Sequence, residues 1–418
     1  MLRTVLFWLH LTAGVLAGAI ILLMSATGVL LTYEKQLLMW ADMRQTDAVN
    51  APLSKHLETD SLIRIATTAK AGSTPVSITL RSDSTAPAQV SFGQNGVLYL
   101  NPVSGAVLGE GSRTARGFFR GVTDWHRWLA GKDKNRELGK KITGAANLLF
   151  LVLVLSGMVL WLPRTWTWLK VRAVLWFRSG LSGKARDFNW HNVLGIWSAL
   201  PLIAIVASAS VIGYPWASDL VYKVVGETPP PRTPPGAAPA AGNPTATASA
   251  NPGQLPRPVS ADASAPASTS PVETLATATG AYAAALATAL PLMPEWRAAT
   301  VQIPKPDAKT FNVTLDRGTG GQPQHRATVT VAAATGALEK YQPFDSLSTG
   351  RQLRSVLRFT HTGEVLGLAG QTLAGLVSLA SVILVVTGIT LAVRRAARAI
   401  ARRGRVPESG VTLGIPAD

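Results

Sequence analysis

The chain has 418 residues, of which 47% are hydrophobic and only 15% carry a charge. This balance favours a membrane protein over two or three soluble domains. The chain contains no cysteine, which excludes disulfide scaffolds, thiolate metal sites, iron–sulfur clusters and cysteine nucleophiles.

The basic excess of +17 lies beside apolar spans. One basic segment, 164–192, falls between two spans, and a second, 394–418, follows the last one. Basic clusters in such places mark the cytoplasmic side of a membrane. The first segment also interleaves tryptophans with basic residues, as a segment lying on an anionic leaflet would. We therefore expect the lipid bilayer, and no nucleic acid, as a partner.

Four apolar stretches are expected to cross the membrane, since about 20 apolar residues suffice. They are residues 1–33, 142–163, 193–216 and 359–393. The first is too long for a signal-peptide core and is followed by no cleavage pattern, so we expect a retained helix. Pro201 is expected to kink the third. Both chain termini then lie in the cytoplasm.

Two polar segments, 34–141 and 272–358, are expected outside as two small α+β elements. Helical spacing runs over 57–69 and 273–289. Strand-like alternation is seen at 76–80, 88–92, 97–100, 299–303, 310–315 and 327–331. Residues 217–271 are rich in Pro, Ala, Ser and Thr, cannot bury enough apolar surface to order themselves, and are expected to form a disordered linker.

The second and fourth spans resemble two copies of one unit. At a constant offset, Gly139, Gly144 and Gly157 match Gly370, Gly375 and Gly388, and Ser156-Gly157 matches Thr387-Gly388. Such matching indicates an internal duplication. The expected fold class is thus a mainly α membrane protein, a four-transmembrane-helix bundle with two small α+β elements outside.

Four of the six histidines lie at or just inside the ends of the four spans. In the expected topology, His10 and His191 lie towards the cytoplasm, and His126 and His361 lie towards the outside. A single histidine at a helix end is more often a packing residue than a ligand. A b-type haem, however, needs two neutral imidazoles from facing helices, so two such pairs point to two bis-histidine haems.

Arg3, Arg127 and Arg358 lie near these histidines and are candidate partners for haem propionates, although arginines at a membrane edge usually snorkel. His56 and His325 fall in polar segments, and we interpret them as surface residues that could also contact a substrate. The sequence holds no Walker loop, dinucleotide fingerprint or HExxH motif, and no catalytic residue is identified. An electron donor, cytoplasmic or in the membrane, would have to be a separate molecule.

Four short motifs together resemble the PepSY-associated transmembrane family. They are His10 followed by Thr27-Gly28, Trp125-His126 followed by Ser156-Gly157, Trp190-His191 followed by Val193-Leu194-Gly195, and His361 followed by Thr387-Gly388. The similarity covers nearly the whole chain except the Pro/Ala/Ser linker. The third span departs from the pattern, with residues 208–213 in place of a clear Thr-Gly.

Members of this family known as iron-regulated membrane proteins include inner-membrane ferric-siderophore reductases with two b haems and PepSY-like domains in the periplasm. The resemblance implies that His126 and His361 hold an outer haem, and that His10 and His191 hold an inner one. It also implies a multi-pass protein of the bacterial inner membrane. Such a protein would pass electrons across the membrane to reduce a ferric siderophore in the periplasm and release Fe(II).

Two other functions stay open at this stage. In the first, the outside elements bind peptides or restrain a periplasmic protease, and the helices serve as an anchor without a chromophore. The second is a haem or siderophore carrier, which polar residues near the middle of the membrane would favour. The spans offer only serines, threonines and Asn147 there.

Overall fold

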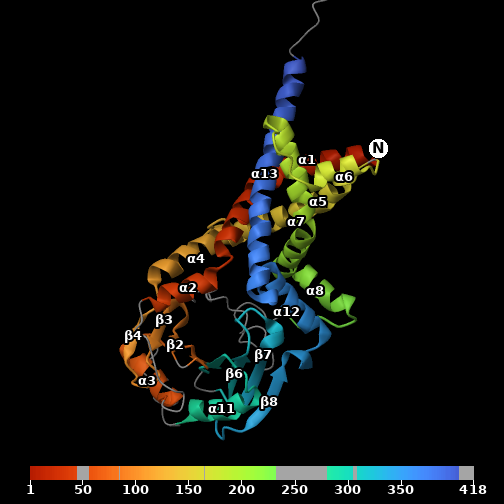
Figure 1. Cartoon of the computed structure of the whole chain (residues 1–418). Helices are drawn as coiled ribbons and strands as arrows, with labels where there is room; N and C mark the ends of the chain where they lie inside the picture. Colours follow the sequence, from red (N-terminus) through yellow and green to blue (C-terminus); the bar gives the residue numbers. More distant parts are fainter. Residues whose placement is uncertain (45–55, 84, 164, 232–279, 305–307, 404–418) are drawn as a thin grey trace, which may run out of the picture.

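Four long apolar helices form a bundle in the computed structural model, which describes residues 1–44, 56–83, 85–163, 165–231, 280–304 and 308–403. These helices are α1 (Leu2–Leu31), α5 (Lys134–Trp161), α7 (Gly183–Gly213) and α13 (Gly367–Arg403) (Figure 1). Each is long and apolar enough to cross a membrane. The structure thus confirms a mainly helical chain with four helices suited to a membrane bundle.

The four helices are arranged as a square. Helix α1 packs against α5 and α13, and α7 packs against the same two helices, so α1 and α7 occupy opposite corners. Large apolar side chains such as Leu16, Leu200 and Leu376 are exposed on the outside of the bundle. Lipid chains are as apolar as leucine, so these side chains suit a bilayer.

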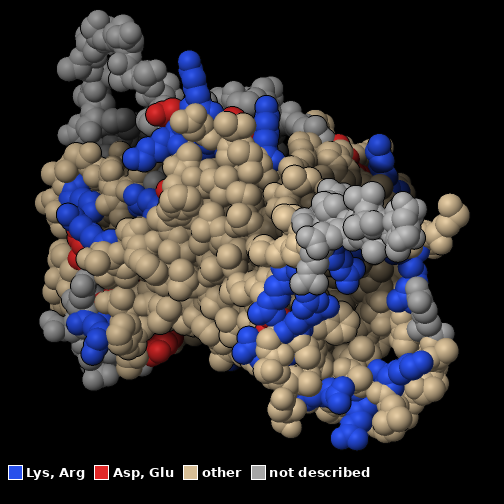
Figure 2. All heavy atoms as spheres, turned by 90° about the horizontal axis from the view of Figure 1, so that it is seen from above, with Lys and Arg blue, Asp and Glu red and all other residues tan. Residues whose placement is uncertain are grey.

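The two ends of the bundle differ. The chain begins at one end, where α13 also ends; we call this the terminal end and the opposite one the sheet end (Figure 1). Seen from the terminal end, Lys and Arg side chains predominate over Asp and Glu on the visible surface (Figure 2). A buried carboxylate, Asp187, holds Arg394 there at 2.8 Å and so joins α7 to α13.

The fourth expected span proves to be two helices. Helix α12 (Thr349–His361) ends at His361, and α13 begins only at Gly367. Between them Gly363 has φ +74°, in the left-handed region that glycine adopts without strain. The charge-free sequence beyond Glu364 gave no sign of this break. The first half has the same design, because helix α4 (Arg113–Trp128) carries His126 and ends just before α5.

Other expected bounds also need correction. The second span begins at Lys134 and the third at Gly183, both earlier than expected, because polar turns continue each helix beyond its apolar run. Pro201 lies inside one uninterrupted helix. The segment 164–192 contains the short helix α6 (Trp168–Leu175), and α13 extends into the basic tail as far as Arg403.

The first residues of the expected linker 217–271 are ordered. Helix α8 (Pro215–Val224) begins with a proline at its first position, where the missing N–H is not needed, and packs against α12. The prediction of disorder is therefore wrong for this part. Residues 232–271 of the linker, the beginning of the helix expected at 273–289, and the tail beyond 403 lie outside the described residues.

The two polar segments together form one antiparallel sheet of eight strands, in the order β4-β3-β2-β1-β5-β6-β7-β8. The strands are β1 (Ser77–Arg81), β2 (Ala88–Ser91), β3 (Val97–Leu100), β4 (Val107–Glu110), β5 (Ala298–Gln302), β6 (Thr310–Asp316), β7 (Arg326–Ala332) and β8 (Leu338–Pro343). The six expected strands are present, and β4 and β8 are additional.

The two expected α+β elements are joined into one sheet. Strand β1 of the first half pairs with β5 of the second from Ser77↔Gln302 to Arg81↔Ala298. Pairing satisfies the N–H and C=O groups that each four-stranded half would leave open at this edge. Strand periodicity reveals that a strand exists, but not which distant strand it meets.

Helices α3 (Thr59–Ala69) and α11 (Ala281–Ala289) cover the face of the sheet that points away from the bundle (Figure 1). Alternate residues such as Ile78, Val301 and Val313 are fully buried beneath them. The residues between these buried ones point to the opposite face of the sheet, because successive side chains along a strand point to opposite faces. One hydrophobic core thus serves both halves of the sheet.

A buried carboxylate joins the sheet to the helix that carries His126. Asp42, 1% exposed, lies at the end of helix α2 (Glu34–Met43), which continues the chain from α1. It accepts hydrogen bonds from the Tyr99 hydroxyl, the Ser112 backbone N–H and the Arg116 guanidinium, each at 2.7 Å. Burial and the bond to Asp42 raise the pKa of Tyr99. Helix α2, strand β3 and the beginning of helix α4 thus meet at one side chain.

We expect Asp42→Ala to lower the free energy of unfolding by about 3–5 kcal/mol, because it leaves the Arg116 charge buried without its partner. The midpoint of thermal unfolding in detergent measures this loss. Arg113→Ala is the matched control, since its side chain is 82% exposed and its ion pair with Glu110 is worth at most about 1 kcal/mol. Equal midpoints for the two variants would contradict the role given to Asp42.

Candidate functional site

The structure brings the four membrane-end histidines together in two pairs. The ring centres of His10 and His191 are 6.4 Å apart, and those of His126 and His361 are 6.2 Å apart. Two imidazole nitrogens that ligate one metal ion at about 2 Å each place their ring centres roughly 6 Å apart. Both separations suit a shared metal ion. The first pair lies towards the terminal end, and the second lies at the sheet end.

Three of the four rings are held by a hydroxyl group from another helix. The Nδ1 atoms of His10, His126 and His191 lie 2.9, 2.9 and 3.0 Å from the hydroxyl oxygens of Ser156, Thr27 and Thr387. Each hydroxyl donates its own proton to a carbonyl one turn back in its helix, at 2.6–2.7 Å. The hydroxyl oxygen can therefore only accept, so Nδ1 carries the proton in each ring.

The fourth ring reaches the same protonation state in another way. Nδ1 of His361 lies 3.0 Å from the backbone carbonyl oxygen of Ile205 in α7, and a carbonyl can only accept. All four histidines thus have Nδ1–H, which leaves the Nε2 lone pair for a ligand. An oxygen that accepts from Nδ1–H, and so fixes the tautomer, is typical of a metal-bound histidine.

Burial also keeps the sheet-end pair uncharged. It lowers the pKa of His126 to about 4, with a smaller contribution from His361, and burial likewise lowers the pKa of His361. Neutral imidazole is the form that binds a metal.

The glycine beside each hydroxyl makes room for a histidine ring. A Cβ atom on Gly157 would lie 3.3 Å from Cε1 of His10, and one on Gly388 would lie 3.2 Å from Cε1 of His191. A Cβ atom on Gly28 would likewise lie 3.8 Å from Cε1 of His126. The Ser/Thr-Gly motif therefore supplies the hydrogen-bond acceptor and the space for the ring together. The sequence showed these motifs, but not which histidine each one serves.

Two further matched glycines allow the turns that place His126 and His361. A Cβ on Gly139 would overlap the backbone of Trp128 at the end of α4, and one on Gly370 would overlap the backbone of Gly363 just after α12. In each half, the helix that carries the histidine thus turns tightly onto the next span. The matched glycines of the duplication thus do the same thing in both halves, because each allows a tight turn.

The three arginines proposed as propionate partners have different surroundings. Arg3 donates hydrogen bonds to the carbonyls of Leu160 and Leu162, at 2.7 and 2.9 Å, and so caps the end of α5. Arg127 and Arg358 lie near the sheet-end pair. Burial lowers the pKa of both guanidiniums, and neighbouring arginines lower it further. Two half-buried cations beside the sheet-end pair form a place suited to an anion.

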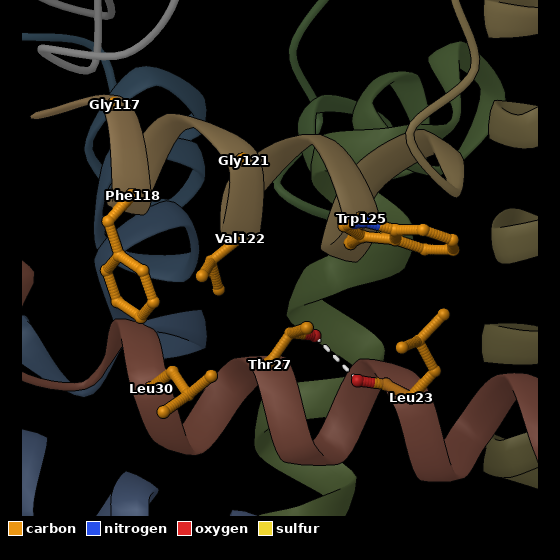
Figure 3. A pocket seen from close by; sticks show the side chains of 8 residues that line it. All are labelled: Leu23, Thr27, Leu30, Gly117, Phe118, Gly121, Val122 and Trp125. Carbon is orange, nitrogen blue, oxygen red and sulfur yellow. Dashed lines mark hydrogen bonds between the residues drawn. The ribbon is translucent and has the colours of Figure 1, made fainter.

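A hollow of about 510 Å³ lies beside the sheet-end pair, between α1 and α4. Leu23, Thr27 and Leu30 line it from α1, and Phe118 and Trp125 line it from α4 (Figure 3). The Thr27 hydroxyl donates to the Leu23 carbonyl at 2.7 Å, so the hollow offers mainly apolar contact. Its chemistry suits a flat apolar ring edge or a lipid chain.

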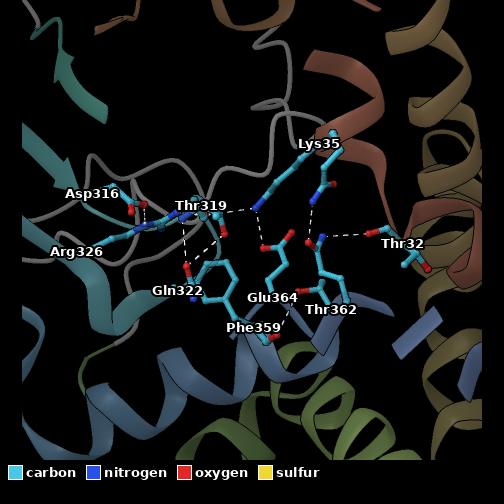
Figure 4. A network of polar contacts seen from close by, with 12 residues as sticks. Thr32, Lys35, Asp316, Thr319, Gln322, Arg326, Phe359, Thr362 and Glu364 are labelled. Atoms are coloured by element: carbon cyan, nitrogen blue, oxygen red, sulfur yellow. Dashed lines mark hydrogen bonds and ion pairs between the residues drawn. The ribbon is translucent and has the colours of Figure 1, made fainter. Parts of the chain in front are cut away.

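A polar network ties the sheet to the turns at the sheet end (Figure 4). Lys35, just after α1, forms an ion pair with Glu364 at 2.7 Å. Arg326 of β7 pairs with Asp316 at 2.7 Å and lies over the ring of Phe359, with its guanidinium carbon 5.4 Å from the ring centre. These contacts hold α12, and with it His361, against one end of the sheet.

The remaining two histidines lie outside the pairs. His56 precedes α3, and His325 lies in a short helical turn before β7; both are half-buried rather than fully on the surface. His325 lines a polar hollow of about 550 Å³ together with Arg317 and Tyr341. Among the described residues no group of three or more His, Cys, Asp or Glu side chains could hold a metal ion.

Polar side chains inside the bundle are used in packing. Asn147 donates to the Val206 carbonyl and the Ser210 hydroxyl, at 3.1 and 3.0 Å, and joins α5 to α7. Gln371 donates to the Thr32 carbonyl at 3.1 Å. Buried polar groups in lipid require such partners. These residues therefore give no support to a carrier with a polar pathway.

A family model described as the PepSY-associated TM region matches residues 7–395. The match includes all four histidines of the two pairs and both halves of the sheet. It confirms the resemblance seen in the histidine and hydroxyl–glycine motifs. The comparison with curated proteins gave no match.

We expect Gly139→Ala and Gly370→Ala each to destabilise the protein by about 3 kcal/mol or more, because the added methyl group meets backbone that cannot move aside. Gly117→Ala in α4 is the control, since a Cβ there meets nothing within 4 Å. The measurement is the yield of monodisperse protein and its thermal unfolding midpoint. Wild-type behaviour of both variants would contradict the tight turns.

Proposed function

The chain belongs to the PepSY-associated TM family, and from this premise we propose a function for its paired histidines. The protein is a di-haem b protein of the bacterial inner membrane. It passes electrons from a donor in the cytoplasm or the membrane to ferric iron that a siderophore holds in the periplasm. Its activity is thus that of a ferric-siderophore reductase, which releases Fe(II).

The observation that carries this proposal is the geometry of the two pairs. In both, the ring centres lie 6.2–6.4 Å apart and the oxygen partners at Nδ1 leave Nε2 as the ligand atom. His10 and His191 would hold one haem, and His126 and His361 the other. Two b-type haems would supply one-electron carriers near the two faces of the membrane.

The chain's other residues would hold and orient these groups. Ser156, Thr27, Thr387 and the Ile205 carbonyl fix the four rings. The glycines beside the three hydroxyls leave space next to the rings. Arg127 and Arg358 would offer positive charge to propionates at the outer site. Arg3 is engaged with carbonyls and fits that role less well.

The orientation follows from charge. The terminal end is rich in Lys and Arg, which the positive-inside rule assigns to the cytoplasm. The sheet then lies in the periplasm, and the His126–His361 pair lies on the substrate side. Two sites near opposite ends of the bundle divide a hydrocarbon core of roughly 30 Å into shorter electron-transfer distances.

The reaction at the outer site is the transfer of one electron to Fe(III) in its chelate, which gives Fe(II) and the unchanged chelator. Hard oxygen ligands hold divalent iron less tightly, so the metal is released. No proton or leaving group is required of the protein in this step. This agrees with the lack of a recognisable catalytic residue in the sequence.

Visible spectra of the purified protein, oxidised and dithionite-reduced, test the proposal. We expect the bands of six-coordinate low-spin b haem at about two haems per chain. His361→Ala and His10→Ala should each remove about half of the signal, because each destroys one pair. His325→Ala is the control and should retain both haems. A colourless wild-type protein would exclude the redox function and leave the non-redox, peptide-binding alternative.

Gly388→Ala tests the space beside the inner pair. The new methyl group would stand 3.2 Å from Cε1 of His191, closer than ordinary contact, and should displace the ring. We expect loss of up to half of the haem signal, with the outer site retained. Gly14→Ala is the control, because its methyl would meet Leu153 at an ordinary 3.6 Å. Full haem content in Gly388→Ala would show that this glycine serves helix packing alone.

A further inference from the structure

The face of the sheet opposite α3 and α11 carries a regular array of hydroxyl and carboxamide groups. In the register of the central strands β1, β5, β6 and β7, one row across the sheet is Thr79, Thr300, Thr314 and Thr328. The adjacent row is Ser77, Gln302, Asn312 and Thr330. Neighbouring strands lie about 4.8 Å apart, so polar groups recur at that interval across both rows. We call these eight residues the threonine face.

The threonine face is turned towards the membrane bundle. The residues between its members, such as Ile78 and Val313, point the other way into the core beneath α3 and α11. At one side of the face, the Tyr99 hydroxyl reaches Asp42 at the end of α2. At the other side, Arg326 lies against Phe359 of α12, two residues before His361. Figure 1 shows the strands between these helices and α3 and α11.

The eight side chains carry no charge, although solvent-facing positions of a sheet commonly hold Lys or Glu. Charged residues occur at the borders. They are Arg81 and the Asp316–Arg326 pair in the next row, and Lys340 of β8, which is opposite Thr330. Threonine is a favoured strand residue, and its presence alone would need no further reason. Two rows of four uncharged residues across the central strands, on the face turned to the outer histidine pair, go beyond that preference.

Hydroxyl and carboxamide groups both donate and accept hydrogen bonds, and they cannot compensate a ligand charge. Some of them already bond within the face, such as Thr79 with Thr300 at 2.9 Å and Thr330 with Asn312 at 3.1 Å. These bonds use one donor or acceptor of each group and leave others available. The complementary ligand is therefore uncharged and rich in amide-like groups.

From these observations we infer that the threonine face binds the organic shell of the ferric chelate, and that it selects chelates without net charge. This rests on the proposed function for the identity of the ligand as a chelate. Bound there, the chelate lies on the side of the sheet where His126 and His361 are placed. The strand residues would give selectivity, and a haem held by His126 and His361 would supply the electron.

Binding of redox-inert gallium chelates tests the inference independently of electron transfer. The full-length protein in detergent is titrated with an uncharged Ga(III) tris-hydroxamate and with a Ga(III) tris-catecholate of charge −3, and affinity is measured by calorimetry. We expect the wild-type protein to prefer the uncharged chelate. The variant with Thr79→Val, Thr300→Val, Thr314→Val and Thr328→Val keeps the side-chain shape and should bind it at least tenfold more weakly.

Two further variants complete the test. Thr68→Val, on the exposed side of α3, is the control and should bind as the wild type does. Asn312→Asp keeps the acceptor for Thr330 and adds one charge to the face, and it should weaken binding even if the fourfold variant does not fold. Unchanged affinity in the fourfold variant or in Asn312→Asp, or a wild-type preference for the tris-catecholate, would overturn the inference. A protein that binds the gallium chelate but holds no haem would refute the proposed reduction and leave the binding face standing.

Discussion

The membrane part of this protein depends on one hydrogen bond that is made four times, from Nδ1 of a histidine to an oxygen of another helix. His10 reaches α5, His126 reaches α1, His191 reaches α13 and His361 reaches α7. In a low-dielectric interior an N–H without a partner is costly, so each ring is held in one orientation. The four Nε2 atoms are then the groups left to meet in pairs.

The departure of the third span from the family pattern has a simple physical explanation. A Ser or Thr hydroxyl inside a helix donates back to a carbonyl of the preceding turn and keeps its lone pairs for an incoming donor. In α7, Ser208 makes such a bond to the Ile205 carbonyl at 2.9 Å. His361 donates to the same carbonyl oxygen directly. The backbone thus replaces the hydroxyl, and the ring keeps the same tautomer.

The sequence was sufficient to predict the parts of the fold that follow from periodicity and charge. Apolar length gave the four spans, alternation gave six of the eight strands, and helix-end positions gave the pairs His10/His191 and His126/His361, which the structure brings together. The duplication also identified Gly139, Gly157 and their matches. Each of these signals is local, or repeats at a fixed offset.

The features that the sequence did not reveal depend on contacts between distant segments. The pairing of β1 with β5 joins strands separated by more than 200 residues, and either edge alone looks like any other strand. The break at Gly363 lies just before the long charge-free run that begins at Val365, and that run alone gives no sign of it. Asp42 could not be distinguished from a surface carboxylate, because its partners Tyr99, Ser112 and Arg116 come from another part of the chain.

The two halves of the duplication are incomplete without each other, and this follows from where each pair takes its members. His10 and His126 belong to the first half, and each lies opposite a histidine of the second. The sheet repeats the arrangement, because β1 of the first half finds its second neighbour in β5, and Thr79 and Thr300 meet across that seam. A single half would therefore expose a strand edge and leave two lone imidazoles inside the bundle, each costly to bury and neither with a partner ring close enough to share a metal ion. Fusion of both copies in one chain keeps the partners together as the protein folds.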